Sequence, residues 1–344
     1  MRRRGVTVLI GIVLVGILTG SLLWVKVPYV ALGPGPTVNT LGSYKDATII
    51  TIEGRESYNP KGQLRLVTVS VSPEISLLDA VYYWFDTDTA VVPRELVYPP
   101  DKSQKQVDNE NAQQFQRSQS SAETAALRKL GYEVKVGVKE VVAGKPSDGK
   151  LKAGDIITAV DGHAVSGVPE VAPLIKAKPV GSPFVIDYTR EGVKGTVTVV
   201  SAANEKGDPA IGVSLEPVQP HPFKIDVKLG DIGGPSAGLM FTLGILAKLD
   251  STDLTGGIVI AGTGTMDDDG TVGPIGGIAQ KLVGAKRDGA KFFLTPADNC
   301  AEAVKNAQPG LPLAKVKTLD DALAALTAIR EHREPVLCGA SDGK

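Results

Sequence analysis

The segment from Pro235 to Leu249 constrains the fold most, because it is apolar on every side. Proline suits the first position of a helix. Hydrophobic side chains then recur at almost every helical position: Leu239, Met240, Phe241, Leu243, Ile245, Leu246 and Leu249. A helix that is hydrophobic all round is a buried helix. We therefore expect residues 235–249 to be buried.

A glycine-rich segment, residues 230–238, leads into this helix and carries Ser236. The first turn of a helix has unpaired backbone N–H groups and the positive end of the dipole, which stabilise a developing oxyanion beside Ser236. Gly233 and Gly234 let a substrate carbonyl approach closely. A capping loop without chemistry and a glycine-rich phosphate cradle are the alternative interpretations.

Lys281 is the candidate partner of Ser236. We predict a helix from Gly277 to Asp288 that ends at Gly289 and has Lys281 at the edge of its apolar face. Desolvation there lowers the pKa of the lysine, so that its neutral amine takes the proton of a serine hydroxyl. The alternative is a lysine whose stem packs while its head reaches water. Only the fold decides between them, because 45 residues separate Ser236 from Lys281.

Several motifs lie in a fixed order around these two residues. They are Gly234-Pro235-Ser236-Ala237-Gly238, Leu254-Thr255-Gly256-Gly257, Val272-Gly273-Pro274-Ile275-Gly276-Gly277, Ala285-Lys286-Arg287-Asp288-Gly289-Ala290, Leu294-Thr295-Pro296 and Asn299. This series closely resembles the proteolytic domain of Lon proteases. The resemblance implies that Ser236 is a nucleophile, that Lys281 is its general base and that Thr255 hydrogen-bonds the lysine.

Two positions depart from the family's pattern. Ala279 stands where many Lon proteins have a lysine, which leaves the Ser-Lys pair intact. Gly233 stands where the family has an acidic residue, and the nearest carboxylate is Asp231, two positions upstream. The role of Asp231 is therefore open.

Other catalytic and ligand-binding systems find little support. The three histidines, His163, His221 and His332, lie in a turn, a proline-flanked linker and the C-terminal tail. The aspartates at 267–269 lack the spacing of a calcium loop, and we predict a hairpin with Asp269-Gly270 at its tip. Residues 144–150 resemble a P-loop but lack its Ser/Thr. We expect no metal, no nucleotide and no other cofactor.

Lon proteins usually couple proteolysis to an ATPase, and no ATPase is visible in this sequence. The resemblance therefore implies a protease that works without ATP on unfolded, flexible or locally exposed segments. The formal net charge of −1 argues against a nucleic-acid partner, which leaves proteins or peptides as the expected substrates.

The chain begins with three arginines and a long uncharged run. Gly5 to Val25 is 21 residues without a charge, and at about 1.5 Å per residue it spans roughly 31 Å, the thickness of a bilayer core. We predict a transmembrane helix at 5–25 in contact with lipid. Because Arg2, Arg3 and Arg4 precede it, residues 1–4 should be a cytoplasmic tail and the rest extracytoplasmic. A cleaved signal peptide is the alternative.

The two cysteines, Cys300 and Cys338, both lie near the end of the chain. Outside the membrane a disulfide between them would persist. A disulfide and two free thiols are both compatible with the sequence.

Residues 131–202 form a compact unit with its own turns. We predict strands at 134–142, 156–160, 184–188 and 193–200 and a short helix at 169–177. Leu151-Lys152-Ala153-Gly154-Asp155-Ile156-Ile157 and Val160-Asp161-Gly162 resemble the PDZ domains of bacterial proteases. PDZ domains bind extended peptides by adding a strand to a sheet edge. A structural spacer is the alternative.

The remaining sequence divides into three parts. Residues 26–130 are an N-terminal extracytoplasmic region with strands at 48–52 and 64–71, an amphipathic helix at 75–85 and a long polar helix at 106–130. Residues 203–332 are the Lon-type domain, with strands at 210–216, 222–229, 254–262 and 291–295, and a capping box at 318–321 opens its last helix. Residues 333–344 are a C-terminal tail.

The predicted fold class is α+β: a Lon-type proteolytic domain with a PDZ module and one N-terminal transmembrane helix. The predicted function is that of a membrane-anchored, ATP-independent Ser-Lys endopeptidase that uses its PDZ domain to bind extracytoplasmic or membrane-associated substrates. An inactive PDZ-bearing scaffold or peptide receptor on the outer face of the membrane is the alternative. The sequence does not indicate an oligomeric state.

Overall fold

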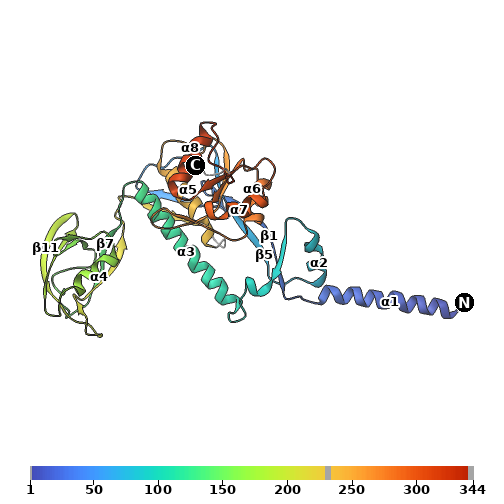
Figure 1. Ribbon diagram of the computed structural model, residues 1–344, viewed down its shortest axis with the longest axis horizontal. Coiled ribbons are helices and arrows are strands. Elements are labelled where there is room, and N and C mark those ends of the chain that lie inside the picture. The colour runs from blue at the N-terminus through green and yellow to red at the C-terminus, as the bar shows by residue number, and fades with distance from the viewer. Residues whose placement is uncertain (1, 229–233, 340–344) are drawn as a thin grey trace. The chain divides into compact units, whose positions relative to one another are not determined.

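The computed structural model describes residues 2–228 and 234–339 of the chain. They form two compact units (Figure 1). Unit 1 combines Met1–Ala126 with Phe223–Lys344, and unit 2 is Leu127–Pro222. The chain leaves unit 1 once and returns to it, so unit 2 is an insertion between the two halves of unit 1.

A six-stranded mixed sheet is the framework of unit 1, in the order β20-β19-β16-β5-β1-β6. Its strands are β1 (Tyr29–Asn39), β5 (Gln63–Ser72), β6 (Ala90–Pro93), β16 (Val259–Gly262), β19 (Phe292–Pro296) and β20 (Leu313–Val316). The strands β5, β16, β19 and β20 are parallel, and β1 runs antiparallel to both of its neighbours. Strands from the N-terminal region and from the Lon-like region therefore share one sheet.

Three two-stranded pairs complete the strands of unit 1 that the structure describes. They are β2 (Ser43–Tyr44) with β3 (Ala47–Thr48), β4 (Ile50–Glu53) with β15 (Lys224–Val227), and β17 (Thr265–Met266) with β18 (Val272–Gly273). In the turn between β17 and β18, Gly270 has a positive φ of 88° and donates its N–H to Asp267 O. The predicted hairpin at Asp269-Gly270 is confirmed.

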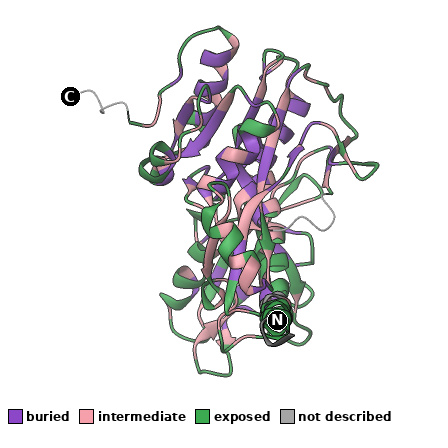
Figure 2. Cartoon of the chain, turned by 90° about the vertical axis from the view of Figure 1, so that its right-hand side faces the viewer, coloured by how far each residue is buried: buried purple, intermediate pink, exposed green. Residues whose placement is uncertain are grey.

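The described helices of unit 1 range from the exposed α1 to the fully buried α5. They are α1 (Arg2–Trp24), α2 (Leu77–Phe85), α3 (Gln104–Lys129, which continues into unit 2), α5 (Gly238–Leu249), α6 (Ile278–Arg287), α7 (Cys300–Lys305) and α8 (Leu319–Arg330). Every residue of α5 is buried, as its apolar sequence predicts. Figure 2 shows how burial is concentrated in the interior strands and helices. The predicted capping box is confirmed at α8, where Thr318 and Asp321 bond each other's backbone N–H groups.

The apolar run at the start of the chain is helical over α1. Among the described residues, no helix combines the length and the apolarity that crossing a membrane requires. The membrane-spanning role of residues 5–25 stays a prediction.

Unit 2 is built on a second sheet, in the order β11-β10-β8-β7-β14 with β9 beside β8. Its elements are β7 (Lys135–Val141), β8 (Ile156–Val160), β9 (His163–Ala164), α4 (Val168–Lys176), β10 (Pro183–Arg190), β11 (Val193–Val200) and β14 (Val213–Val218), with the pair β12 (Ala202–Ala203) and β13 (Pro209–Ala210). Apolar side chains of these strands and of α4 form its core, among them Val136, Ile157, Phe184 and Ile186. The strand that we expected at 210–216 is β14, which pairs with β7 in this sheet.

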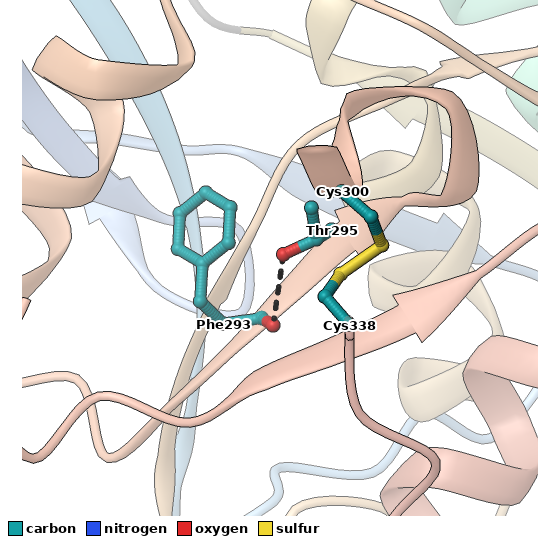
Figure 3. The surroundings of a disulfide bond; sticks show 4 residues. All are labelled: Phe293, Thr295, Cys300 and Cys338. Atoms are coloured by element: carbon teal, nitrogen blue, oxygen red, sulfur yellow. Dashed lines mark hydrogen bonds between the residues drawn. A yellow bond between two sulfur atoms is a disulfide. The ribbon is translucent and has the colours of Figure 1, made fainter. Parts of the chain in front are cut away.

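A disulfide joins Cys300, at the start of α7, to Cys338, which follows β20 (Figure 3). The two Cα atoms are 5.2 Å apart, and 38 positions separate the residues in sequence. Backbone bonds from Lys315 N to Val336 O and from Cys338 N to Leu313 O lay the C-terminal segment along β20. Of the two alternatives for the cysteines, the structure has the disulfide.

We expect removal of this disulfide to destabilise unit 1. In the chain-entropy model a closed loop of this length is worth about 4 kcal/mol. Cys300→Ser combined with Cys338→Ser should therefore lower the denaturant midpoint of unfolding, measured by circular dichroism. Reductant should lower the midpoint of the wild type to that of the double variant and leave the variant unchanged. Equal midpoints in all four samples would contradict the prediction.

Candidate active site

Ser236 lies in a single 3-10 turn, Pro235–Ala237, that leads directly into α5. Its carbonyl oxygen accepts hydrogen bonds from Gly264 N at 3.0 Å and from Thr263 Oγ1 at 3.1 Å. The carbonyl oxygen of Pro235 accepts a third bond, from Ser118 Oγ of α3, at 2.9 Å. Three hydrogen bonds thus fix the backbone on either side of the candidate nucleophile.

Two glycines in this turn meet different requirements. Gly234 has a φ of 128°, a conformation that side-chain-bearing residues rarely adopt. At Gly238 the neighbours are close: a Cβ atom would lie 2.8 Å from Met266 N and 2.9 Å from Ser118 Oγ. Asp231, whose role the sequence left open, and Gly233 lie outside the described residues.

Lys281 projects from the first turns of α6 and is 3% exposed. Its neighbours Ile278, Leu282 and Ala285 pack against Ala261 and Phe293 of the sheet, as the helical pattern predicts. Burial penalises the charged ammonium and lowers the pKa of Lys281 to about 7. The amine is therefore half neutral near physiological pH, whereas an exposed lysine is almost wholly charged.

Thr263 links the two candidate residues. Lys281 Nζ donates a hydrogen bond to Thr263 Oγ1 at 3.2 Å, and the same hydroxyl donates to the carbonyl oxygen of Ser236. Because Thr263 Oγ1 accepts a hydrogen bond from the amine, it orients the lysine side chain. In the neutral amine this leaves the lone pair free to accept a proton from another group.

Thr255 does not hold the position that the resemblance implied. Its hydroxyl donates to Asp253 Oδ1 at 2.5 Å and accepts from Gly62 N and Gly257 N. Thr255 is thus the centre of a buried turn, and Thr263 is the threonine that binds the lysine. Nothing in the sequence distinguishes Thr263, because a threonine that follows a buried strand has the same local pattern as any other core residue.

Ser236 and Lys281 line one cavity of about 520 Å³. The sequence separates them by 45 residues, and the fold brings them to the same walls. Thr68 and Val69 supply another wall, because β16 pairs with β5 only over Gln63–Leu66 and the rest of β5 runs on beside the cavity. The sequence of this N-terminal region carries no catalytic motif that would indicate such a role.

Asn299 shapes a further wall of the cavity. Its side-chain amide binds both backbone groups of Ile275: Oδ1 accepts from Ile275 N and Nδ2 donates to Ile275 O, each at 2.9 Å. Ile275 and Gly276 both line the cavity. This clamp gives a structural reason for the asparagine that the family resemblance included.

A second buried lysine offers a contrast. Among the lysines that the structure describes, only Lys248 and Lys281 are buried. Lys248 lies in the last turn of α5, and its Nζ donates to Asn59 Oδ1 at 2.7 Å. Burial lowers the pKa of Lys248 as well. It does not line the cavity with Ser236, so position rather than burial alone singles out Lys281.

Within residues 2–228 and 234–339, no three side chains of His, Cys, Asp or Glu gather closely enough to hold a metal ion. The cavity itself is lined by a serine hydroxyl and by a lysine amine whose pKa is lowered. Together they suit proton abstraction and nucleophilic attack.

Two protein families match this chain. Residues 107–200 match the PDZ domain family, and residues 187–328 match the Lon protease (S16) C-terminal proteolytic domain. The first match falls largely on unit 2, and the second includes Ser236, Thr263, Lys281 and Asn299. The chain thus contains a region similar to PDZ domains and a region similar to the proteolytic domain of Lon proteases, which supports a serine protease.

Individual Lon proteases are similar to part of this chain. Lon protease 1 of Sorangium cellulosum is 34% identical over 128 residues, which are 36% of this chain and 16% of that protein. The Lon protease of Haemophilus influenzae is 30% identical over 142 residues, 40% of this chain and 17% of that protein. Lon protease 2 of Bacillus subtilis is 26% identical over 201 residues, 57% of this chain and 34% of that protein. The chain therefore spans only a small part of these relatives.

Among solved structures, the PDZ domain of the SdrC-like protein from Listeria monocytogenes is 32% identical. The match covers 24% of this chain and 86% of that domain, with a TM-score of 0.23. The PDZ domain of the SdrC-like protein from Listeria innocua gives the same identity and TM-score and is covered to 92%. These scores are too low to support an argument about the fold.

Proposed function

We propose that this protein is a membrane-anchored, ATP-independent serine endopeptidase in which Ser236 is the nucleophile and Lys281 the general base. One observation carries the proposal: a lysine whose pKa burial lowers to about 7 lines the same cavity as Ser236. A neutral Lys281 takes the proton of the Ser236 hydroxyl as its oxygen attacks a peptide carbonyl. The lysine then delivers that proton to the departing amine, which leaves an acyl-enzyme for water to hydrolyse.

The proposed location is the extracytoplasmic face of the cell membrane. The uncharged run from Gly5 to Val25 after three arginines supports an anchor with its N-terminus in the cytoplasm. The disulfide between Cys300 and Cys338 supports an oxidising compartment for unit 1. The proposed substrates are accordingly secreted or membrane-associated proteins with flexible segments.

The test compares protein N-termini in cells that express the wild type or Ser236→Ala. We expect new N-termini in secreted or membrane proteins that are present with the wild type and absent with the variant. Ser118→Ala is the comparison variant. It removes a hydrogen bond to Pro235 but no proposed catalytic group, so it should lose less activity than Ser236→Ala. Identical termini in the wild-type and Ser236→Ala cells would contradict the proposed activity. Changes confined to cytoplasmic proteins would contradict the proposed orientation.

We further propose that unit 2 binds substrates for the protease. The PDZ family match supports it, because PDZ domains take up extended peptides at a sheet edge. Replacing residues 134–200 with a short Gly/Ser bridge should leave cleavage of a small flexible peptide largely unchanged. Cleavage of a natural substrate should fall, because binding energy remote from the chemistry is lost. Equal losses on both would instead give unit 2 a structural role.

A further inference from the structure

The short helix α2 has an apolar surface that the described part of the chain leaves uncovered. None of its residues is buried, although its sequence is Leu-Leu-Asp-Ala-Val-Tyr-Tyr-Trp-Phe. Tyr82 is 71% exposed, Trp84 75% and Phe85 81%. Isolated exposed hydrophobic residues are normal, but adjacent large ones mark a contact surface. The sequence predicted this amphipathic helix but not that its apolar face would point outward.

These side chains lie on one face. At about 100° per residue, Trp84, Val81, Phe85 and Tyr82 fall within an arc of roughly 160°. Asp79, the one charged residue of α2, lies outside the arc, about 60° beyond Tyr82. Its carboxylate accepts bonds from Ser76 N and Ser76 Oγ in a capping box. The exposed face, which we call the aromatic face of α2, therefore carries no charge.

The start of α2 is tied to the end of α1. Leu77 N donates to Val25 O at 3.0 Å, and Val27 N donates to Ile75 O at 3.2 Å. Lys26 and Ser76 form a β-bridge between the same segments. Trp24, the last residue of α1, is itself 86% exposed. The aromatic face thus begins where the apolar N-terminal run ends.

We propose that the aromatic face of α2 binds the surface of the lipid bilayer and seats unit 1 against it. The inference rests on the membrane anchor of the proposed function. Trp and Tyr prefer the boundary between lipid headgroups and acyl chains, and an amphipathic helix lies in that plane. Its continuity with the apolar run at 5–25 favours lipid as the occupant over a second protein, because an anchored chain holds this helix beside the bilayer.

Contact between the aromatic face of α2 and the bilayer limits where the proposed protease cuts. Val69, which lines the cavity, is eight residues before Leu77, so at most about 28 Å of extended chain separates the cavity wall from the start of α2. The aromatic face therefore holds the cavity within a short distance of the lipid surface. The substrate class that follows is membrane-attached proteins, cut in the flexible segment next to their own anchor.

The chain offers a direct probe, because its only two tryptophans are Trp24 and Trp84. The full-length variant Ser236→Ala/Trp24→Phe has Trp84 as its only tryptophan, whose emission is excited selectively. The variant is reconstituted in phosphatidylcholine vesicles. We expect blue-shifted emission, quenching by bromine on the upper acyl chain and protection from iodide in the water. The matched control carries Trp24→Phe, Trp84→Phe and Val336→Trp, which places the tryptophan at an exposed position of unit 1. That control should be quenched by iodide and not by brominated lipid.

Each other result has a definite meaning. Iodide quenching of Trp84 in chains that float with the vesicles would overturn the lipid seat and leave the anchor intact. Protection of Trp84 from both quenchers would overturn it in favour of a protein occupant. Chains that do not float with vesicles would overturn the anchor and the seat together. Because the Ser236→Ala background is used, none of these results depends on the proposed protease activity.

A second arm measures the consequence for cleavage. Tyr82→Ser/Trp84→Ser/Phe85→Ser changes only exposed side chains, so folding should be preserved. We expect cleavage of a lipid-anchored substrate with a short flexible spacer to fall at least about tenfold, because the anchor at 5–25 alone no longer holds the cavity at a fixed distance from the bilayer and its effective concentration there falls. Cleavage of the same segment as a free peptide should be unchanged. Equal rates for wild type and triple variant on the anchored substrate would contradict the proposed cutting range.

Discussion

Lys281→Arg should be as inactive as Lys281→Ala and Ser236→Ala. An arginine keeps charge and bulk at this position, but its guanidinium does not give up a proton in a protein, so it cannot serve as the base. We expect the rate of peptide cleavage to fall by at least about a thousandfold in each variant, without additivity when they are combined. Lys286→Arg is the matched control, because Lys286 is an exposed lysine of the same helix. It should retain the wild-type rate.

The pH profile of the wild type provides a second readout of the same base. Only the neutral amine accepts a proton, and the pKa of Lys281 is lowered to about 7. The value of kcat/KM should therefore rise with pH through about 7 and then level off. Near-normal turnover of folded Lys281→Arg, or a rate that does not change between pH 5 and 9, would show that another group is the base.

Lys281→Met should stabilise the protein, and most strongly at low pH. The pKa of the lysine is lowered from 10.5 to about 7 in the folded state, so between these values the unfolded chain binds more protons than the folded one. Stability of the wild type must then rise with pH across this window. The cost of burying the ammonium is fully present below pH 7 and amounts to about 5 kcal/mol. Methionine removes that cost, and Thr263 keeps its bond to Ser236.

Denaturant titrations at pH 6 and pH 9 test this expectation. The gain in unfolding free energy of Lys281→Met over the wild type should be several kcal/mol at pH 6 and smaller at pH 9. Lys286→Met, the exposed control, should change stability by less than about 0.5 kcal/mol at either pH. An equal gain at both pH values would mean that packing and not charge burial is responsible. The stable but inactive variant would also show that loss of activity does not come from misfolding.

The sequence predicted the two central residues of the site because each is embedded in local signals. Ser236 lies between glycines at the start of an apolar helix, and Lys281 interrupts the apolar face of another. Both features arise from neighbours within one or two helical turns. The structure confirms both helices and brings the two residues to one cavity.

The parts that the sequence did not reveal depend on contacts between distant segments. Thr68 and Val69 line the cavity only because β5 pairs with β16, from the other half of unit 1. Thr263 contacts Lys281 because β16 ends beside α6. The spacing of residues in the sequence does not predict this contact. The family resemblance implied Thr255 instead, but the hydroxyl of Thr255 hydrogen-bonds Asp253 within a turn. Long-range strand pairing leaves no periodic trace in the sequence of either strand.

The pairing of β5 with β16 also determines at which stage of synthesis the proposed active site can be completed. Leu66 is made early, but its partner Gly262 follows only after the whole of unit 2 has been added. Pairings between such distant segments form slowly, whereas unit 2 is continuous and free to fold first. A chain that stops before β16 has Ser236, Thr68 and Val69 but lacks Thr263, Lys281 and the wall at Ile275 and Gly276. We therefore expect unfinished chains not to cleave the proteins around them, because the proposed site is complete only after β16 and α6 have been made.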